Sequence, residues 1–234
     1  DVLPGHVDVG TRVHEYGGGA FAVRDGRIVY SERSDGSVWL LDARGLRPLA
    51  AIAGCRYAGF AVDARRTRVF AVREDHRDRP PTAADNAIVA LSLAAGADPA
   101  ANAGRVVTPP SDFVLAPQLA PDGTQLAWIA WNHPAMPWDE TRLWVADVDD
   151  AETLANARCV AGANGGEAIV EAHWTPGGTL LFSSDRTNWW NLYALRGERA
   201  EALAPVDAEI GEPPWVLGRA SFAPAGEERV LCAV

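Results

Sequence analysis

Apolar and polar residues alternate in short runs along the chain, and a tight turn follows many of these runs. The clearest example spans residues 116–148. Leu119 precedes a Pro-Asp-Gly turn, an alternating run follows at residues 125–130, and a second run follows at residues 141–148. A period of two, interrupted by turns that contain Gly, Pro and Asp, is typical of consecutive antiparallel strands.

The same arrangement occurs five times, each time with an apolar residue before the turn. The five anchors lie 39, 59, 55 and 48 residues apart, and they are Phe21, Phe60, Leu119, Trp174 and Phe222. A four-stranded propeller blade needs about 40–50 residues, so each interval can hold one blade, with a loop insertion in the longer cases. The sequence therefore predicts an all-β fold, a β-propeller of four-stranded antiparallel blades of the TolB-like or WD type.

The predicted blades cover residues 14–50, 51–112, 113–165 and 166–212, and a fifth blade at 213–234 is incomplete. The chain begins at Asp1 without a Met and stops at Val234 inside an expected strand. Such a stop would leave an unpaired sheet edge, which natural sheets avoid. We therefore expect an internal piece of a longer protein, with about four and a half blades.

Composition agrees with a globular, cytoplasmic protein. The 234 residues are 48% hydrophobic, enough for a substantial core without disulfides. The isolated Cys55, Cys159 and Cys232 indicate reduced and mostly buried thiols, with Cys232 as a small buried residue in a strand. No apolar run is long enough for a membrane helix and no leader pattern is present, so we expect no membrane partner.

The charge pattern argues against binding to nucleic acid. The formal net charge is −10, and the 21 basic residues, all Arg, are scattered among 31 acidic ones. Binding to a phosphate backbone needs a basic stripe, which the sequence lacks. An acidic, soluble surface is the interpretation that we favour.

No catalytic motif is recognisable. None of the eight serines lies in Gly-x-Ser-x-Gly, and the metalloprotease, EF-hand and dinucleotide motifs are absent. His76 lies among acidic residues in an interruption of the second blade at 73–86, where a solvated loop is favoured over a metal site. We expect no catalytic residue, no metal and no cofactor in this chain.

Two loops carry candidate binding residues. In residues 13–20, three consecutive glycines indicate either a bulged first strand near the propeller axis or a cavity mouth that Glu15 and Tyr16 would line. The insertion at 131–140 contains Trp131, Trp138 and Glu140. It either packs over a neighbouring blade or presents an aromatic surface to a partner domain or a substrate.

Three further segments are predicted to be structural. Residues 94–111 form an exposed connection between blades. Residues 183–193 form a turn in which Arg186 holds Asp185 or a neighbouring blade through charge-assisted hydrogen bonds. Residues 209–216 form another crossing between blades, and Trp215 opens the next strand.

Several segments resemble the propeller of bacterial peptidases in the prolyl oligopeptidase family, above all the dipeptidyl-aminopeptidase or acylaminoacyl-peptidase-like branch. The most specific are the His-Glu-Tyr-Gly-Gly-Gly run at 14–19 and the double-tryptophan segment at 184–193, and the resemblance covers nearly the whole chain. It implies a propeller of seven or eight blades that caps a C-terminal α/β-hydrolase domain and restricts entry to short peptides. The Ser, Asp and His triad of the family lies in that second domain, so no catalytic residue is carried over.

The resemblance implies a substrate-gating propeller of a serine exopeptidase, inactive by itself, with its own hydrolase domain and short peptides as partners. Glu15, Tyr16, Trp131, Trp138 and Glu140 are then predicted to face the substrate cavity, where the carboxylates could pair with the N-terminal ammonium of a peptide. The alternative is a non-catalytic TolB-like or WD-type propeller that serves as a binding scaffold. The sequence leaves open a homo-oligomer and a metal in the axial funnel of the propeller.

Overall fold

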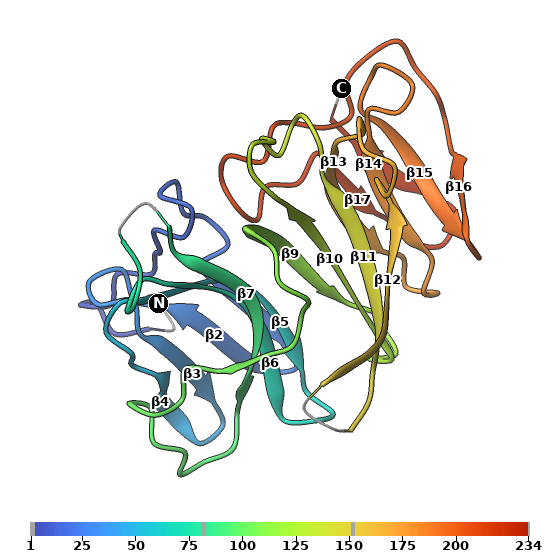
Figure 1. Cartoon of the computed structure of the whole chain (residues 1–234). Helices are drawn as coiled ribbons and strands as arrows, with labels where there is room; N and C mark the ends of the chain where they lie inside the picture. Colours follow the sequence, from blue (N-terminus) through green and yellow to red (C-terminus); the bar gives the residue numbers. More distant parts are fainter. Residues whose placement is uncertain (1–2, 81–82, 151–152, 234) are drawn as a thin grey trace. The chain divides into compact units, whose positions relative to one another are not determined.

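The computed structural model describes residues 3–80, 83–150 and 153–233, and these residues form strands, turns and loops (Figure 1). The described residues contain no helix long and apolar enough to cross a membrane. Antiparallel sheets of four strands repeat along the chain. The predicted all-β fold, a propeller built from four-stranded antiparallel blades, is confirmed.

The chain divides into two compact units. Unit 1 runs up to Pro110 and includes Val216–Gly218; unit 2 contains Ser111–Trp215 and the residues from Arg219 onward. Each of the five sequence anchors lies in the first strand of its sheet.

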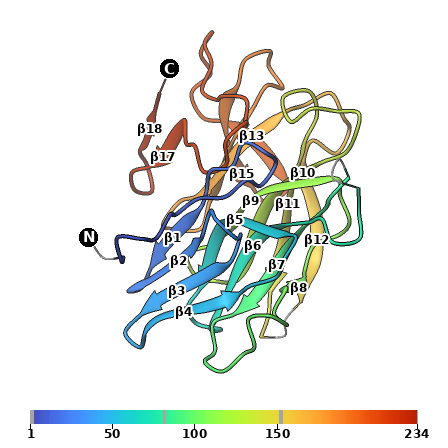
Figure 2. The same ribbon diagram turned by 90° about the vertical axis from the view of Figure 1, so that its left-hand side faces the viewer.

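Unit 1 contains two sheets in which the strands follow one another in chain order, as Figure 2 shows for the first of them. The first sheet consists of β1 (Phe21–Arg24), β2 (Arg27–Ser31), β3 (Val38–Asp42) and β4 (Gly45–Ala50). The second consists of β5 (Cys55–Asp63), β6 (Arg68–Asp75), β7 (Asp85–Ser92) and the short β8 (Arg105–Val106).

Unit 2 contains two sheets of four strands and one of two strands. The third sheet of the chain consists of β9 (Phe113–Leu119), β10 (Gln125–Trp131), β11 (Arg142–Val148) and β12 (Leu154–Ala161). The fourth consists of β13 (Ile169–Trp174), β14 (Leu180–Ser184), β15 (Asn191–Arg196) and β16 (Arg199–Ala202). The two-stranded sheet consists of β17 (Phe222–Pro224) and β18 (Val230–Cys232).

Apolar side chains that alternate along the strands fill the space between successive sheets of one unit. In unit 1, Val29 and Leu40 of the first sheet and Val62 and Val89 of the second belong to one buried cluster. In unit 2, a corresponding cluster joins the third and fourth sheets through Ile129 and Phe182, among others. Because each such side chain contributes about 1.5–3 kcal/mol when fully buried, the period-two pattern itself specifies which face of each sheet is covered.

Buried hydroxyl groups connect the first, third and fourth sheets to the chain segment that follows each of them. The Ser31 hydroxyl donates to the carbonyl oxygen of Tyr57 at 2.8 Å, which joins β2 to β5. The Thr141 hydroxyl, which directly precedes β11, donates to the carbonyl of Ile169 in β13 at 2.7 Å and accepts from its N–H at 2.6 Å. In the same way, the Ser183 hydroxyl of β14 donates to the carbonyl of Ile210 at 2.5 Å. These bonds satisfy buried backbone groups that belong to no ladder.

The structure corrects two of the sequence interpretations in the last segment. Trp215 does not open a strand, because the next strand begins only at Phe222, and Leu217 instead forms an isolated parallel bridge with Gly18 in unit 1. Cys232 is exposed, because β18 pairs only with β17 among the described residues and no further strand covers it.

Two loop boundaries also differ from expectation. β6 continues to Asp75 and β7 starts at Asp85, which pair directly with each other, so the loop between these strands is shorter than the predicted interruption. The connection at 94–111 contains β8, the fourth strand of its sheet. Pro81, predicted in a loop, and Val234, predicted in a strand, lie outside the described residues.

Candidate functional site

Four loops of unit 1 gather at one end of its two sheets. At this end β1, β3, β5 and β7 begin, and β2 and β6 end, so the segments 11–20, 32–37, 51–54 and 76–80 are neighbours. The opposite end carries tight turns such as Asp25-Gly26, where both residues have positive φ, as a two-residue hairpin requires. Loops on a rigid sheet are the usual location of binding residues.

Glu15 lies in this loop end, within a chain of alternating charges. Its carboxylate accepts from Arg12 Nη2 at 2.8 Å and from Arg56 Nη1 at 2.6 Å. Arg56 Nη1 also donates to the nearly buried Glu74 at 3.1 Å and to the carbonyl oxygen of Arg12 at 3.0 Å. The hydrogen bond from Arg56, together with that from Arg12, lowers the pKa of Glu15 below its ordinary value. Glu15 is therefore held as a carboxylate.

The backbone that presents Glu15 is unusual. His14 and Glu15 have φ values of 53° and 66°, in the left-handed region that residues with a Cβ rarely adopt. Gly18 follows with φ 87°, and a Cβ at this position would collide with the backbone of Leu217. The triple-glycine run thus permits a close backbone approach in unit 1, and the turn before it is strained, as turns at functional sites often are.

Glu74 connects this charged network to two histidines. The carboxylate lies 3.2 Å from His76 Nε2, and both side chains are mostly buried. On the other side, His14 interacts with Asn86, and burial lowers the pKa of His14 although the Glu74 carboxylate opposes this. The described residues contain no group of three or more His, Cys, Asp and Glu that could hold a metal ion.

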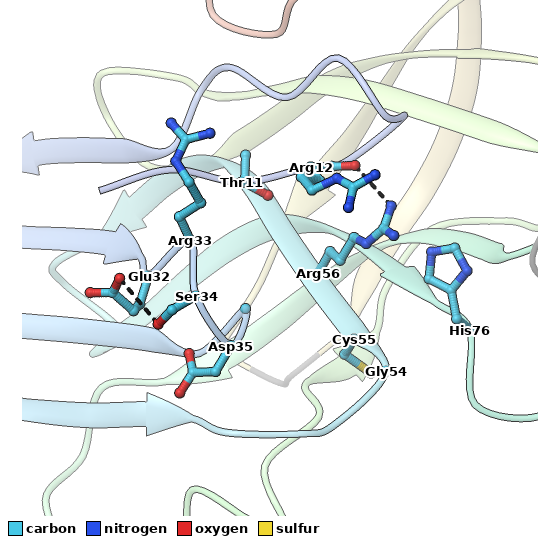
Figure 3. A pocket seen from close by; sticks show the side chains of 11 residues that line it. Thr11, Arg12, Glu32, Arg33, Ser34, Asp35, Gly54, Cys55, Arg56 and His76 are labelled. Atoms are coloured by element: carbon cyan, nitrogen blue, oxygen red, sulfur yellow. Dashed lines mark hydrogen bonds between the residues drawn. The ribbon is translucent and has the colours of Figure 1, made fainter. Parts of the chain in front are cut away.

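A polar pocket of about 290 Å³ opens beside this network (Figure 3). Figure 3 shows the guanidinium groups of Arg12 and Arg56 next to each other with the His76 ring beside them, while Glu32 and Asp35 lie on the other side. The remaining lining residues come from the same loops, and they are Thr11, Arg33, Ser34, Gly36, Gly54 and Cys55. The sequence interpretation selected Glu15 but missed Arg12 and Arg56. These two arginines lie 44 positions apart in the sequence, and only the fold brings the Arg56 side chain to the backbone carbonyl of Arg12.

The other predicted residue of unit 1, Tyr16, has a side chain on the surface. It is 61% exposed. It directly follows Glu15, and the structure thus presents the acidic and the aromatic candidate side by side in one turn.

The candidates of unit 2 occupy two different environments. Trp131, at the end of β10, is only 6% exposed and stacks on Phe113 with 5.0 Å between ring centroids, so it belongs to the core. Trp138 lies in the loop before β11 and packs against the half-exposed Trp215, at 4.3 Å between centroids. This second pair presents an aromatic surface within unit 2.

Glu140 lies beside Thr141 at the end of the same loop, where its carboxylate accepts from Arg142 at 3.3 Å. A Cβ at Gly165 would lie 3.1 Å from the Glu140 carboxylate, so the absence of a side chain there leaves room for Glu140. Both acidic candidates are therefore paired with arginine.

The double-tryptophan segment holds a network that differs from expectation. Arg186 donates to Glu167 through Nε at 2.9 Å and Nη2 at 2.6 Å, and it lies over the Tyr193 ring at 4.9 Å. Asp185 instead accepts the N–H of Ala168 at 2.7 Å. Arg186 thus fixes the loop before β13 of its own sheet, and its partner is not Asp185.

Comparison with known proteins identifies relatives of this architecture. A puromycin-hydrolyzing peptidase from Mycobacterium tuberculosis is 34% identical, with a TM-score of 0.85 over 98% of this chain and 37% of that protein. A puromycin hydrolase mutant complexed with PGG is 32% identical, with a TM-score of 0.85 over 95% of this chain and 36% of that protein. The chain therefore spans little more than a third of these relatives.

More distant structures share the fold alone. TolB from Acinetobacter baumannii is 17% identical with a TM-score of 0.54, over 86% of this chain and 48% of that protein. No protein-family model and no curated protein matches the chain. The puromycin hydrolases are matched through their propeller portion. Over nearly its whole length, the chain therefore matches the propeller portion of peptidases of the prolyl oligopeptidase family.

Proposed function

We propose that this chain is the substrate-gating propeller portion of a serine exopeptidase that acts on short peptides. The observation that carries the proposal is the likeness to puromycin-hydrolyzing peptidases at 32–34% identity over at least 95% of the chain. A C-terminal α/β-hydrolase domain of the intact protein would supply the nucleophile, since none of the eight serines here lies in a Gly-x-Ser-x-Gly motif. The propeller would supply selection by size and charge.

The geometry of the loops supports such a selective role. In unit 1 the loop end carries the Glu15 network and an open polar pocket, and in unit 2 the loops before β11 and β13 carry Glu140 and Glu167. Buried hydrogen bonds hold these loops to the sheets, so they can present charge without large rearrangement.

The proposed role of Glu15 is to recognise the N-terminal ammonium of a peptide. Its carboxylate has about four acceptor positions, of which Arg12 and Arg56 use two, and its side chain is 56% exposed. An ammonium can therefore share the carboxylate with the two guanidinium groups. Tyr16, Trp138 and Glu140 remain predicted cavity residues, whereas Trp131, which is buried in the core, would contribute only through the packing of its loop.

The first experiment is labelling of the full-length gene product with a fluorophosphonate probe for activated serines, followed by a denaturing gel. A labelled band well above the 25.0 kDa of this chain is expected. A folded, full-length product that takes no label would overturn the peptidase proposal and favour the scaffold.

Gating is tested by comparing hydrolysis of a chromogenic aminoacyl substrate, puromycin and an unfolded polypeptide. A gate predicts rapid cleavage of the first two and none of the third.

The role of Glu15 is tested by Glu15→Gln in the full-length enzyme. Loss of a charge-assisted hydrogen bond should lower kcat/KM about tenfold or more for substrates with a free amino group. Glu198→Gln, in the exposed turn between β15 and β16, is the matched control and should leave kcat/KM unchanged. Equal kinetics of the Glu15 variant and the wild type would refute this role, while labelling by the probe would still support a peptidase.

A further inference from the structure

The pocket at the loop end of unit 1 has a chemistry that the gating role does not explain. Three arginines and two acidic residues line it, although the chain as a whole carries a net charge of −10. The lining side chains are charged or polar apart from Cys55 and two glycines, so they offer several hydrogen-bonding groups to a ligand. The pocket therefore suits a small, polar ligand with an anionic group.

The guanidinium groups have donors left for such a ligand. Arg56 makes all its hydrogen bonds to described residues through Nη1, and Arg12 makes its bond through Nη2. The Nε and Nη2 groups of Arg56 and the Nε and Nη1 groups of Arg12 thus have no partner among the described residues. A guanidinium has five N–H donors in a planar fork, which matches the two oxygens of a carboxylate.

Glu15 and Glu74 hold the two guanidinium groups in place. Two like charges side by side would repel each other, but the Glu15 carboxylate contacts both groups and the Glu74 carboxylate contacts Arg56. The arginines are therefore preorganised before a ligand arrives, which lowers the entropy cost of binding.

The opposite wall determines which anion is suitable. Glu32 accepts the backbone N–H of Asp8 with both oxygens at 3.3 Å and the Ser34 hydroxyl at 3.4 Å, so it has capacity for a further donor. Two carboxylates in one small pocket repel a dianion such as phosphate, but they attract an ammonium or an amide N–H. The two walls are thus complementary to a zwitterion.

We propose that this pocket binds the carboxylate of a free amino acid or short peptide through Arg12 and Arg56, with its amino or amide group directed to Glu32. The volume of about 290 Å³ is at the lower end of small-molecule sites, as a ligand of this size requires. The identification of the ligand as a peptide substrate or product rests on the proposed peptidase function. The binding of a zwitterion in this pocket does not depend on that function.

The test is saturation-transfer NMR on the full-length protein with L-alanine, which a peptidase cannot hydrolyse. Saturable binding of L-alanine is expected, with ethylamine, which keeps the amino group but lacks the carboxylate and has no bond that a peptidase hydrolyses, at least about tenfold weaker. Arg12→Gln should weaken alanine binding about tenfold or more, and since the Arg12 side chain is 62% exposed, the variant should fold. Arg44→Gln, in the exposed turn between β3 and β4, removes the same charge away from the pocket and should change nothing.

Three results would overturn the proposal: no saturable binding of alanine, equal binding by the Arg12 variant and the wild type, or displacement of alanine by inorganic phosphate at lower concentration than by glycine. The variant also separates this pocket from a hydrolytic centre that binds alanine, because only binding in the pocket depends on Arg12. If the fluorophosphonate probe fails to label the protein but alanine binding still depends on Arg12, the peptidase function fails and the pocket remains.

Discussion

Replacing Thr141 by Val removes a hydroxyl group from a buried junction between two sheets of unit 2 while it keeps the shape of the side chain. Thr141 is fully buried, and its hydroxyl both donates to and accepts from the backbone of Ile169, at 2.7 and 2.6 Å. The N–H of Thr141 also donates to the carbonyl of Glu167 at 3.0 Å. The hydroxyl thus fixes the end of the Trp138 and Glu140 loop against the start of β13.

The expected loss of stability follows from the two hydrogen bonds. A buried N–H or carbonyl group left without a partner costs about 1–3 kcal/mol, and Thr141→Val leaves both groups of Ile169 in this condition. We therefore expect a decrease of about 2–4 kcal/mol in the free energy of unfolding. Thr141→Ser keeps the hydroxyl and loses one methyl group, so its expected cost is about 1 kcal/mol.

Urea denaturation followed by tryptophan fluorescence measures these differences. Thr124→Val is the matched control, because among the described residues its hydroxyl bonds only Asp122, in an exposed hairpin turn, and a change of about 0.5 kcal/mol or less is expected. If Thr141→Val were no more destabilising than Thr124→Val, or if Thr141→Ser were as damaging as Thr141→Val, the hydroxyl would not hold the junction together.

Two further predictions concern charged groups. The bidentate Arg47 partner lowers the pKa of Asp42 to about 2 from 3.8, so Asp42 stabilises the fold above pH 4 and this contribution is lost as the pH falls toward 2. Asp42→Asn should lower the free energy of unfolding by about 1–2 kcal/mol at pH 7, after allowance for partial solvent screening. The unfolding free energies of the variant and the wild type, measured against pH, should converge near pH 2. Curves that stay apart there would contradict a stabilising role of the ionised Asp42. Arg186→Lys should lower the free energy of unfolding, measured by urea denaturation, by about 1 kcal/mol, because Lys cannot form the forked hydrogen bonds to Glu167 or stack on Tyr193. The exposed Arg196→Lys is the control, and an equal effect of the two substitutions would contradict the prediction.

The fold could be predicted because its signals are local. Each anchor, such as Phe60 or Trp174, is followed within a few residues by its own turn and by the alternating run that pairs with it. Turn residues with positive φ, such as Gly26 and Gly123, specify the hairpins directly. A repeated local signal accumulates along the chain, so the class of fold was evident without knowledge of any contact between sheets.

The charged networks could not be predicted, because their partners are distant in sequence. Arg56 meets Glu15 across 41 positions, and Arg186 meets Glu167 across 19. Many acidic residues were equally available to each arginine, so the sequence suggested Asp185 or a neighbouring blade for Arg186, whereas its partner is Glu167 of its own sheet. The error at Cys232 has a similar origin, because the burial of a strand depends on its neighbours in the sheet and not on its own pattern.

The hydroxyl junctions explain how a rigid scaffold can hold charged loops in this chain. Ser31, Thr141 and Ser183 each lie within or next to a strand at the loop end of a sheet, and each bonds a backbone group of the next segment. A residue of this kind fixes where a loop starts or ends without constraining the residues inside it. The loops can therefore carry charged side chains such as Glu15 and Glu140 in defined positions, while the apolar faces that hold the sheets together remain unchanged. The proposed gating role would need this separation, because changes in the loops could then alter substrate preference and leave the stability of the propeller intact.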